Sequence, residues 1–300
     1  MGNRRNIFIG FTAAVIAVGV ATDALAWGPA THVKFASDLL GNLWLLPAAL
    51  GALLSRHPRY FIYGNVATDT VLAKKMSRVK QVCHRWATGF SLFDAAQTDE
   101  GRAFAYGYLS HLAADTVAHN KFLPRQMAVC HSTITFGHIY WEIRADAVIE
   151  RPYWDGLRDA LRGRYPEPER LLRSQLTETM LSYRTNRIIF KRVNLLASLS
   201  AWRRSVEFWS KLSRFPLDGE IVQTYHDESM SRMVDVIEHG RASIVLHEDP
   251  NGNSAMSFAR AQRRQIRQMR RAGISHVHVV EEAAAGHAAN PKRLPVRALE

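Results

Sequence analysis

Histidines and carboxylates recur at helical spacing in the middle of the chain. His111, Asp115 and His119 are each four residues apart, and His138 and Glu142 repeat that spacing. Residues four apart lie on one face of a helix, so an imidazole and a carboxylate there can bind one metal ion. A single such pair is more often a core histidine beside its ion-pair partner. Two pairs and a third histidine favour a metal site, and nitrogen and oxygen ligands without thiolate suit zinc, with iron or manganese as alternatives.

Three more candidate ligand segments precede this region. Trp27 begins the sequence Trp-Gly-Pro-Ala-Thr-His, which ends at His32. Asp69 follows a Gly-Asn pair, and His84 lies 15 residues after it. An A-x-A cleavage site ends at Ala26, so cleavage there would expose the amino group of Trp27 five residues before a histidine.

The first 26 residues have the pattern of a signal peptide. Two arginines precede the apolar run Ile7–Ala21, whose 15 residues are fewer than the roughly 20 that a membrane span needs. We therefore expect export to the periplasm or the medium, with an uncleaved anchor as the alternative. Export would permit a disulfide between Cys83 and Cys130, and two buried thiols are the equally weighted alternative.

The order of these residues resembles the zinc-dependent phospholipase C family, which shares an all-helical fold with the single-strand-specific zinc nucleases. The resemblance covers roughly Trp27 to Glu150. It implies an all-α helical bundle without an appended β-sandwich, and a cluster of three zinc ions. It distributes the ligands over the three ions as Trp27 (amine and carbonyl) with His32; Asp69, His84, His111 and Asp115, which bridges to the first ion; and His119, His138 and Glu142.

The chain departs from the family pattern at two places. In the characterised phospholipases the histidine after His-x-x-x-Asp comes about half a turn later than His119, so His131 is an alternative ligand. Some choline-preferring members carry an acidic residue where this chain has Ala30. Selectivity for a choline headgroup is therefore not implied.

The resemblance implies hydrolysis of a phosphodiester by zinc-activated water, with Asp69 orienting that water or accepting its proton. On a phospholipid the products would be diacylglycerol and a phosphorylated headgroup. Glu142 favours this reading, because the nuclease branch usually has aspartate there, and so does the apolar stretch Leu43–Leu54. A nuclease or other phosphoesterase is the second hypothesis, with Tyr63, Trp86 and Tyr140 as candidates for base stacking. A zinc-binding helical protein without turnover is the third.

The composition agrees with a globular protein that meets anions. Of 300 residues, 47% are hydrophobic and 22% are charged, which excludes wholesale disorder. Only 2 cysteines exclude a disulfide-dense scaffold and a four-cysteine zinc ribbon. A net charge of +12 implies attraction to phospholipid surfaces, nucleic acid or phosphate esters without choosing among them. No feature indicates an obligate protein partner.

Helical patterns fill most of the chain, and no strand-like alternation persists. We expect a helix that Thr31 caps and a kinked or split helix over Leu43–Leu54. From Arg59 to Asp69 we expect a short irregular or extended segment that leads into a loop with Asp69. We place the other helices at 104–119, 134–149, 157–181 (two helices around a turn), 188–212 and 219–239.

The domain expectation is a signal peptide over residues 1–26, a catalytic domain over 27–256, and a C-terminal region over 257–300. That region contains six arginines and no acidic residue between Ser257 and Ile274. The pattern fits a basic helix that contacts phosphate or a membrane surface, and a solvated helical face is the favoured alternative. After Val280 the composition predicts a disordered tail.

Overall fold

The structure, a computed structural model, describes residues 27–71, 81–129, 134–177, 179, 181–213, 215 and 217–290. These residues form helices and turns and contain no strand, which confirms the all-α prediction. The predicted signal peptide and the final ten residues lie outside the described part. None of the helices in that part is both long and apolar enough to span a membrane.

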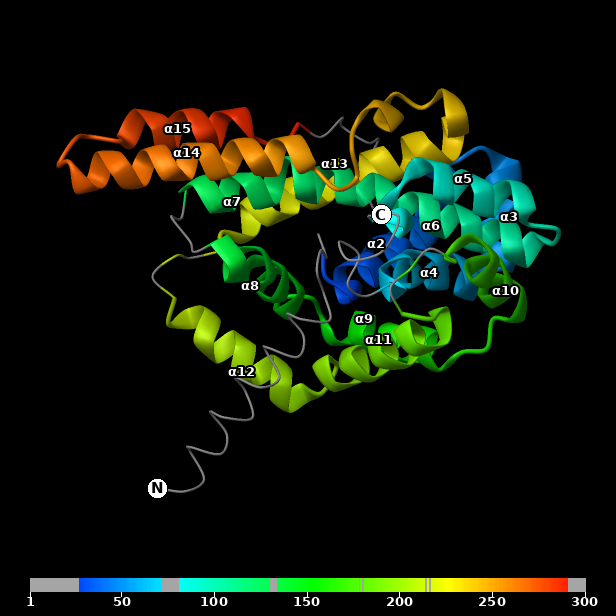
Figure 1. Ribbon diagram of the computed structural model, residues 1–300. Coiled ribbons are helices and arrows are strands. Elements are labelled where there is room, and N and C mark those ends of the chain that lie inside the picture. Colours follow the sequence, from blue (N-terminus) through cyan, green and yellow to red (C-terminus); the bar gives the residue numbers. More distant parts are fainter. Residues whose placement is uncertain are drawn as a thin grey trace, which may run out of the picture.

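Figure 1 shows the order and arrangement of the helices. The α-helices are α2 (Pro29–Gly41), α3 (Ala48–Arg56), α4 (Pro58–Ala67), α5 (Trp86–Ala95), α6 (Asp99–Val117), α7 (Leu123–Val129), α8 (Ile134–Ala147), α9 (Arg151–Arg162), α10 (Pro166–Gln175), α11 (Tyr183–Ala197), α12 (Ser200–Lys211), α13 (Gly219–His239), α14 (Asn253–Arg271) and α15 (Val277–Gly286). Short 3-10 turns occur at Leu43–Leu45, Thr68–Thr70, Val82–His84, Gly240–Ala242 and Ile244–His247, and a π-helical turn occurs at Ala118–Phe122.

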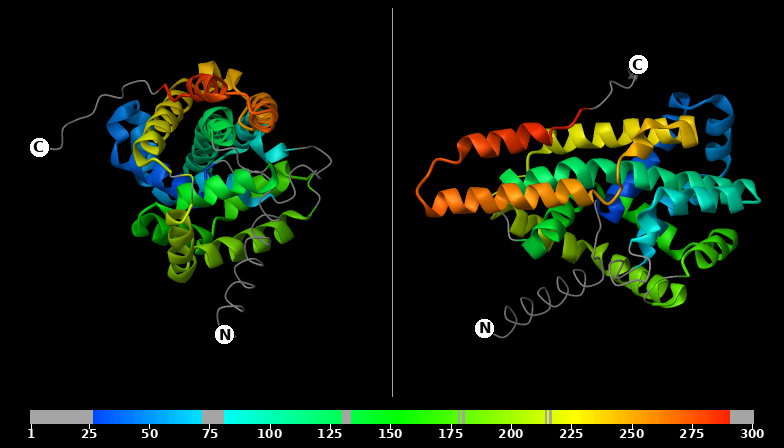
Figure 2. Two further views of the ribbon diagram at one scale, coloured as in Figure 1. Left: turned by 90° about the vertical axis from the view of Figure 1, so that its left-hand side faces the viewer. Right: turned by 45° about the horizontal axis from the view of Figure 1, so that its top comes forward.

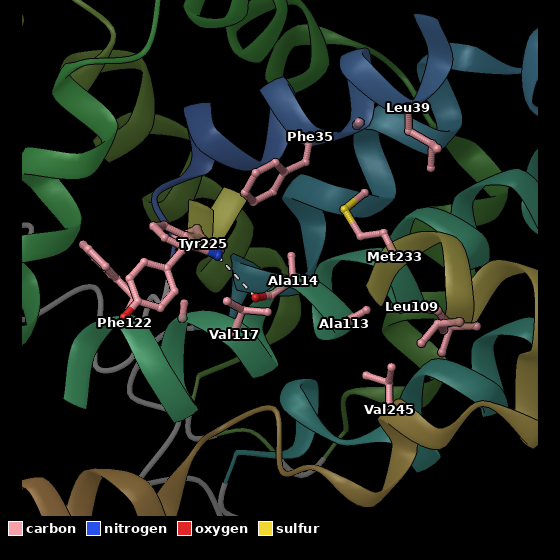
Figure 3. Close-up of a cluster of buried hydrophobic side chains, with 14 of the residues drawn as sticks. Phe35, Leu39, Leu109, Ala113, Ala114, Val117, Phe122, Tyr225, Met233 and Val245 are labelled. Atoms are coloured by element: carbon pink, nitrogen blue, oxygen red, sulfur yellow. Dashed lines mark hydrogen bonds between the residues drawn. The ribbon is translucent and has the colours of Figure 1, made fainter. Parts of the chain in front are cut away.

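Helix α6 is the centre of the fold. It packs most extensively against α4 and α13, with α5 beside it, so all but a few of its residues are buried. Figure 3 shows buried side chains of α6, α2 and α13 that pack in one hydrophobic cluster. Among them are Leu109 and Val117 of α6, Phe35 of α2 and Met233 of α13. Helices α14 and α15 form a hairpin along one side of the molecule, and α11 and α12 lie on the opposite side (Figures 1 and 2).

Two glycines allow α4 and α6 to touch backbone to backbone. A Cβ atom added to Gly64 would lie 2.2 Å from the carbonyl oxygen of Phe104, and one added to Gly107 would lie 2.1 Å from that of Phe61. No side chain fits at either position, because such distances are far below van der Waals contact. The Gly-Asn pair at Gly64 is therefore part of a close helix–helix contact and not a turn.

This contact corrects the expectation of an irregular segment over Arg59–Asp69. Pro58 starts α4 at its first position, where the missing N–H costs nothing, and the helix continues to Ala67. Asp69 consequently lies in the 3-10 turn that follows, and not in an open loop. The expected break in Leu43–Leu54 is confirmed, since Pro47 separates a 3-10 turn from α3.

Three other expectations change in detail. Thr31 does not cap α2, which begins at Pro29 after Gly28. The window 188–212 contains two helices, because the chain turns at Ser198 and Leu199. The predicted disorder after Val280 is wrong for residues 281–286, which belong to α15. That helix packs against α7 and α14, and its Val279 and Ala283 are buried.

Candidate metal centre

Five of the predicted ligands meet in the interior. His32 comes from α2, His111 and Asp115 from α6, Asp69 from the 3-10 turn after α4, and His84 from the 3-10 turn before α5. Each side chain is at most 2% exposed. Segments separated by up to 83 residues thus place imidazoles and carboxylates in one buried cluster.

Asp115 is at the middle of this cluster. Its Oδ1 lies 3.2 Å from Nε2 of His32, and its Oδ2 lies 3.1 Å from Nε2 of His84 and 3.2 Å from Nε2 of His111. The two oxygens face different imidazoles, an arrangement that suits a carboxylate shared between two ions. Asp69 completes the cluster, with Oδ1 3.3 Å from Nε2 of His84 and 3.9 Å from that of His111.

The orientation of His111 is fixed by the helix contact described above. Its Nδ1 donates a hydrogen bond to the backbone carbonyl of Asn65 at 2.7 Å, so its Nε2 carries a lone pair. That nitrogen lies 3.2 Å from Nε2 of His84. The rings of His32 and His111 stack with centroids 3.8 Å apart. The Nε2 atoms of His84 and His111 therefore face each other at short range.

Buried lone pairs that face one another need a cation between them. Burial lowers the pKa of His32, with the nearby His111 acting in the same direction, so the neutral imidazole is favoured at neutral pH. Burial alone would raise the pKa of Asp115, but the neighbouring His111, His32 and His84 outweigh it and keep that pKa well below its usual range. The buried oxygens of Asp115 and nitrogens of His32 make no hydrogen bond. A buried carboxylate surrounded by imidazole nitrogens in this arrangement fits a divalent metal.

The donor atoms form two overlapping groups. In each group the candidate ligand atoms lie within 4.8 Å of one another: His32 with Asp69 and His111, and His84 with His111 and Asp115. Imidazole nitrogens with carboxylate oxygens are typical ligands of zinc at sites where catalysis occurs. The geometry is that of a candidate metal centre.

Comparison with protein families agrees with this chemistry. The family model described as zinc dependent phospholipase C matches residues 31–190, more than half of the chain. The chain belongs to the zinc-dependent phospholipase C family. Neither the curated proteins nor the solved structures gave a match. The family assignment makes zinc the expected metal of the buried His and Asp groups.

The three ligands predicted for a third zinc lie farther along the chain. His119 is in the π-helical turn that continues α6, and its Nδ1 donates to the carbonyl of Pro250 at 2.6 Å. Its Nε2 is then the nitrogen with a lone pair. Glu142 is 2% exposed on α8. The backbone of His138 is also on α8, but its side chain lies outside the described residues, as does the alternative ligand His131. The assignment of these residues to one ion stays a prediction.

Trp27 is held directly beside Asp115. Its indole nitrogen lies 3.2 Å from the carbonyl oxygen of Ala114 and 3.2 Å from the hydroxyl of Ser229, both within donating range. The indole is fully buried and stacks on Phe122 with ring centroids 4.8 Å apart. The side chain therefore fixes the start of the predicted mature chain next to the metal centre.

One functional residue that our sequence reasoning missed is Asp146. Its Oδ1 accepts hydrogen bonds from the backbone and the hydroxyl of Thr31, at 2.7 and 2.8 Å, and its Oδ2 accepts one from the backbone of Ala30 at 3.2 Å. It thus caps α2 from another helix and positions His32. Its spacing of four residues after Glu142 repeats the His138–Glu142 interval and was a usable signal.

A second missed feature is the segment Glu248–Gly252, which we call the strap. Besides the bond from His119 to Pro250, Asn251 donates to the carbonyl of His84 at 2.8 Å, and the indole of Trp86 donates to the carbonyl of Glu248 at 2.9 Å. The strap holds the backbone or ring of two predicted ligands.

The raised pKa of Asp146 predicts that the free energy of unfolding of the chain depends on pH. Burial raises its pKa from 3.8 to about 6, against the hydrogen bonds from Thr31 and Ala30. The folded chain holds this proton more tightly than the unfolded chain, so the stabilisation present below about pH 4 is lost as the pH rises through 6. Relative to Asp146→Asn, the wild type should lose about 3 kcal/mol of unfolding free energy between about pH 4 and 7. Denaturant unfolding of both chains across that range measures this, and a pH-independent difference would contradict it.

The strap lies in tight contact with His119 at Gly252. Gly252 has a φ of +57°, and a Cβ there would lie 2.3 Å from the carbonyl oxygen of His119. Gly273 also has a positive φ, +68°, but open space around it. Both Gly→Ala variants should lose about 1–2 kcal/mol for the left-handed backbone. Gly252→Ala should lose about 1–3 kcal/mol more and release zinc sooner during dialysis. Equal losses in denaturant unfolding and equal zinc retention would show that the contact is unimportant.

Proposed function

We propose that this protein is an exported phospholipase C that hydrolyses phospholipids to diacylglycerol and a phosphorylated headgroup. The observation that carries the proposal is the buried cluster of His32, Asp69, His84, His111 and Asp115, within a chain of the zinc-dependent phospholipase C family. The family implies a phospholipid substrate.

The chain's residues would hold zinc and prepare the phosphodiester for attack. Bound zinc would neutralise the nonbridging oxygens of the phosphate and lower the pKa of a water ligand from 15.7 to about 7. His32, His84, His111 and Asp115 are the residues that would hold it, because their donor atoms converge. The hydrogen bond from His111 to Asn65 keeps the protonated nitrogen of that ring away from the cluster.

Asp69 is the residue best placed to accept a proton. Its carboxylate oxygen Oδ1 faces the cluster from a 3-10 turn, opposite the ligands on α6. A carboxylate at this position can orient the attacking water or take its proton as general base. Burial of the whole group excludes bulk water and strengthens each electrostatic interaction within it.

Asp69→Asn tests the proposed reaction. The variant keeps the size and one ligand oxygen but removes the negative charge and the base. Hydrolysis of phospholipid vesicles by zinc-loaded protein at neutral pH should fall at least about a hundredfold, since loss of a general base costs 10²–10⁴ in rate. Elemental analysis should find more than one zinc in the wild type, and most of it should remain in the variant.

The control is Asp94→Asn, an exposed aspartate that pairs with Arg241 and should leave turnover unchanged. Near wild-type turnover by Asp69→Asn with full metal would remove Asp69 from the mechanism. Release of mononucleotides from single-stranded nucleic acid without diacylglycerol from lipid would favour the nuclease hypothesis instead. Zinc binding without either product would favour a non-catalytic protein.

Export is proposed from the sequence before Trp27. The basic start, the short apolar run and the A-x-A site support cleavage after Ala26. The exported protein should then begin at Trp27, and N-terminal sequencing of secreted or periplasmic material measures this. A different start with full phospholipase activity would exclude the amine of Trp27 as a zinc ligand.

A further inference from the structure

Helices α11 and α12 present an apolar surface to solvent. Six large apolar side chains there, which we call the α11–α12 surface, are between 44% and 63% exposed: Ile188, Leu196, Leu199, Phe208, Trp209 and Leu212. Phe208 and Leu212 are one turn apart, so they share a face. Isolated exposed apolar residues are ordinary, whereas six such side chains on two consecutive helices and the residues that flank α12 are the kind of surface found at interaction sites.

The inner face of α12 is fixed by polar contacts with α8. Arg144 of α8 donates to the hydroxyl of Ser210 at 2.6 Å and to the carbonyl of Phe215 at 2.6 Å. The hydroxyls of Tyr140 and Ser213 lie 2.5 Å apart. These contacts determine which face of α12 is directed inward. The apolar side chains on the other face therefore stay exposed.

The same two helices carry a large positive charge. Residues 183–212 contain seven Lys or Arg side chains and one acidic residue, Glu207, a net charge of +6 within a chain whose total is +12. Arg187 pairs with Glu169 of α10, while Arg204 on α12 and Arg192 on α11 are exposed. Aromatic and aliphatic side chains beside Lys and Arg are typical of helices that lie in a membrane interface.

An apolar pocket lies between α8 and the inner side of α11 and α12. Val193 and Ala197 of α11 and Val206 of α12 line one wall. The other wall, on α8, includes Glu142, one of the predicted zinc ligands, and the capping residue Asp146. The pocket thus places the inner side of α11 and α12 next to one of the predicted zinc ligands.

We propose that the α11–α12 surface docks on an anionic phospholipid bilayer. Phe208, Trp209 and Leu212 enter the headgroup region, while the cations of both helices attract lipid phosphates. The choice of a lipid partner rests on the proposed function and on the exposed aromatic side chains, since a nucleic-acid partner would not require an apolar face directed at it. The surface is separate from the α14–α15 hairpin, which lies on the opposite side (Figures 1 and 2).

Vesicle flotation of the purified chain tests the docking without requiring turnover. The wild type should float with phosphatidylglycerol-rich vesicles and bind phosphatidylcholine vesicles more weakly. Phe208→Ser combined with Leu212→Ser should bind phosphatidylglycerol-rich vesicles at least about tenfold more weakly. Its hydrolysis of vesicle lipid should fall in parallel, while hydrolysis of a water-soluble short-chain phospholipid should be unchanged.

The matched control is Phe258→Ser with Ile274→Ser on the α14–α15 hairpin. These side chains are 58% and 56% exposed, and they lie near the arginine-rich helix. This control should float as the wild type does. A control that loses binding while the α11–α12 variant keeps it would overturn the proposal in favour of the hairpin.

Two other outcomes would also overturn it. Sedimentation velocity that shows a wild-type dimer and a monomeric α11–α12 variant, with vesicle binding unchanged, would make the surface a contact between two copies of this chain. Stronger binding to single-stranded nucleic acid than to vesicles, lost in the same variant, would replace the lipid by nucleic acid. If the wild type floats but releases no diacylglycerol, docking stands and the proposed phospholipase activity fails.

Discussion

A carboxylate that is fully buried among imidazoles is the constraint on which this structure depends. Asp115 has both oxygens within 3.2 Å of imidazole nitrogens and no water-exposed surface. Transferring such a charge into the interior is costly unless it is compensated by opposite charge. The helices around it bring imidazole nitrogens and a second carboxylate into the same buried cluster, which favours binding of divalent metal.

Two backbone devices make that arrangement possible. The contact of Gly64 with Gly107 brings α4 close enough to α6 for the carbonyl of Asn65 to orient His111. Asp146 supplies the acceptors that Gly28 cannot provide at the start of α2, and so holds His32 against α6. In both cases the residue that acts contacts backbone near a ligand. Gly64 and Gly107 act because they lack a side chain, and Asp146 acts because its carboxylate accepts hydrogen bonds from backbone N–H groups.

The sequence allowed the helical fold and the ligand positions on α6 to be predicted, because His111 and Asp115 share a face by spacing alone. Asp69 was harder to place. Its preceding Gly-Asn pair has the composition of a turn, and only the packing of Gly64 against α6 shows that the chain is helical there. Asp146 and the strap were missed because they act through contacts with backbone 115 to 167 residues away in the sequence. Composition and periodicity carry no information on contacts of that kind, although the regular interval from Glu142 to Asp146 was visible.

The strap also has a consequence for how the molecule is assembled. It lies beyond residue 190, where the family match ends, yet it supplies the carbonyl that orients His119 and a side chain that holds His84. Two predicted ligands within the matched segment are therefore held by residues that lie outside it. Because the chain is synthesised from its N-terminus, the central ligands are made long before the strap residues that hold two of the predicted ligands. We therefore expect zinc to bind late in folding, after the strap is in place. A fragment that ends near residue 190 would bind zinc in a loosely ordered state.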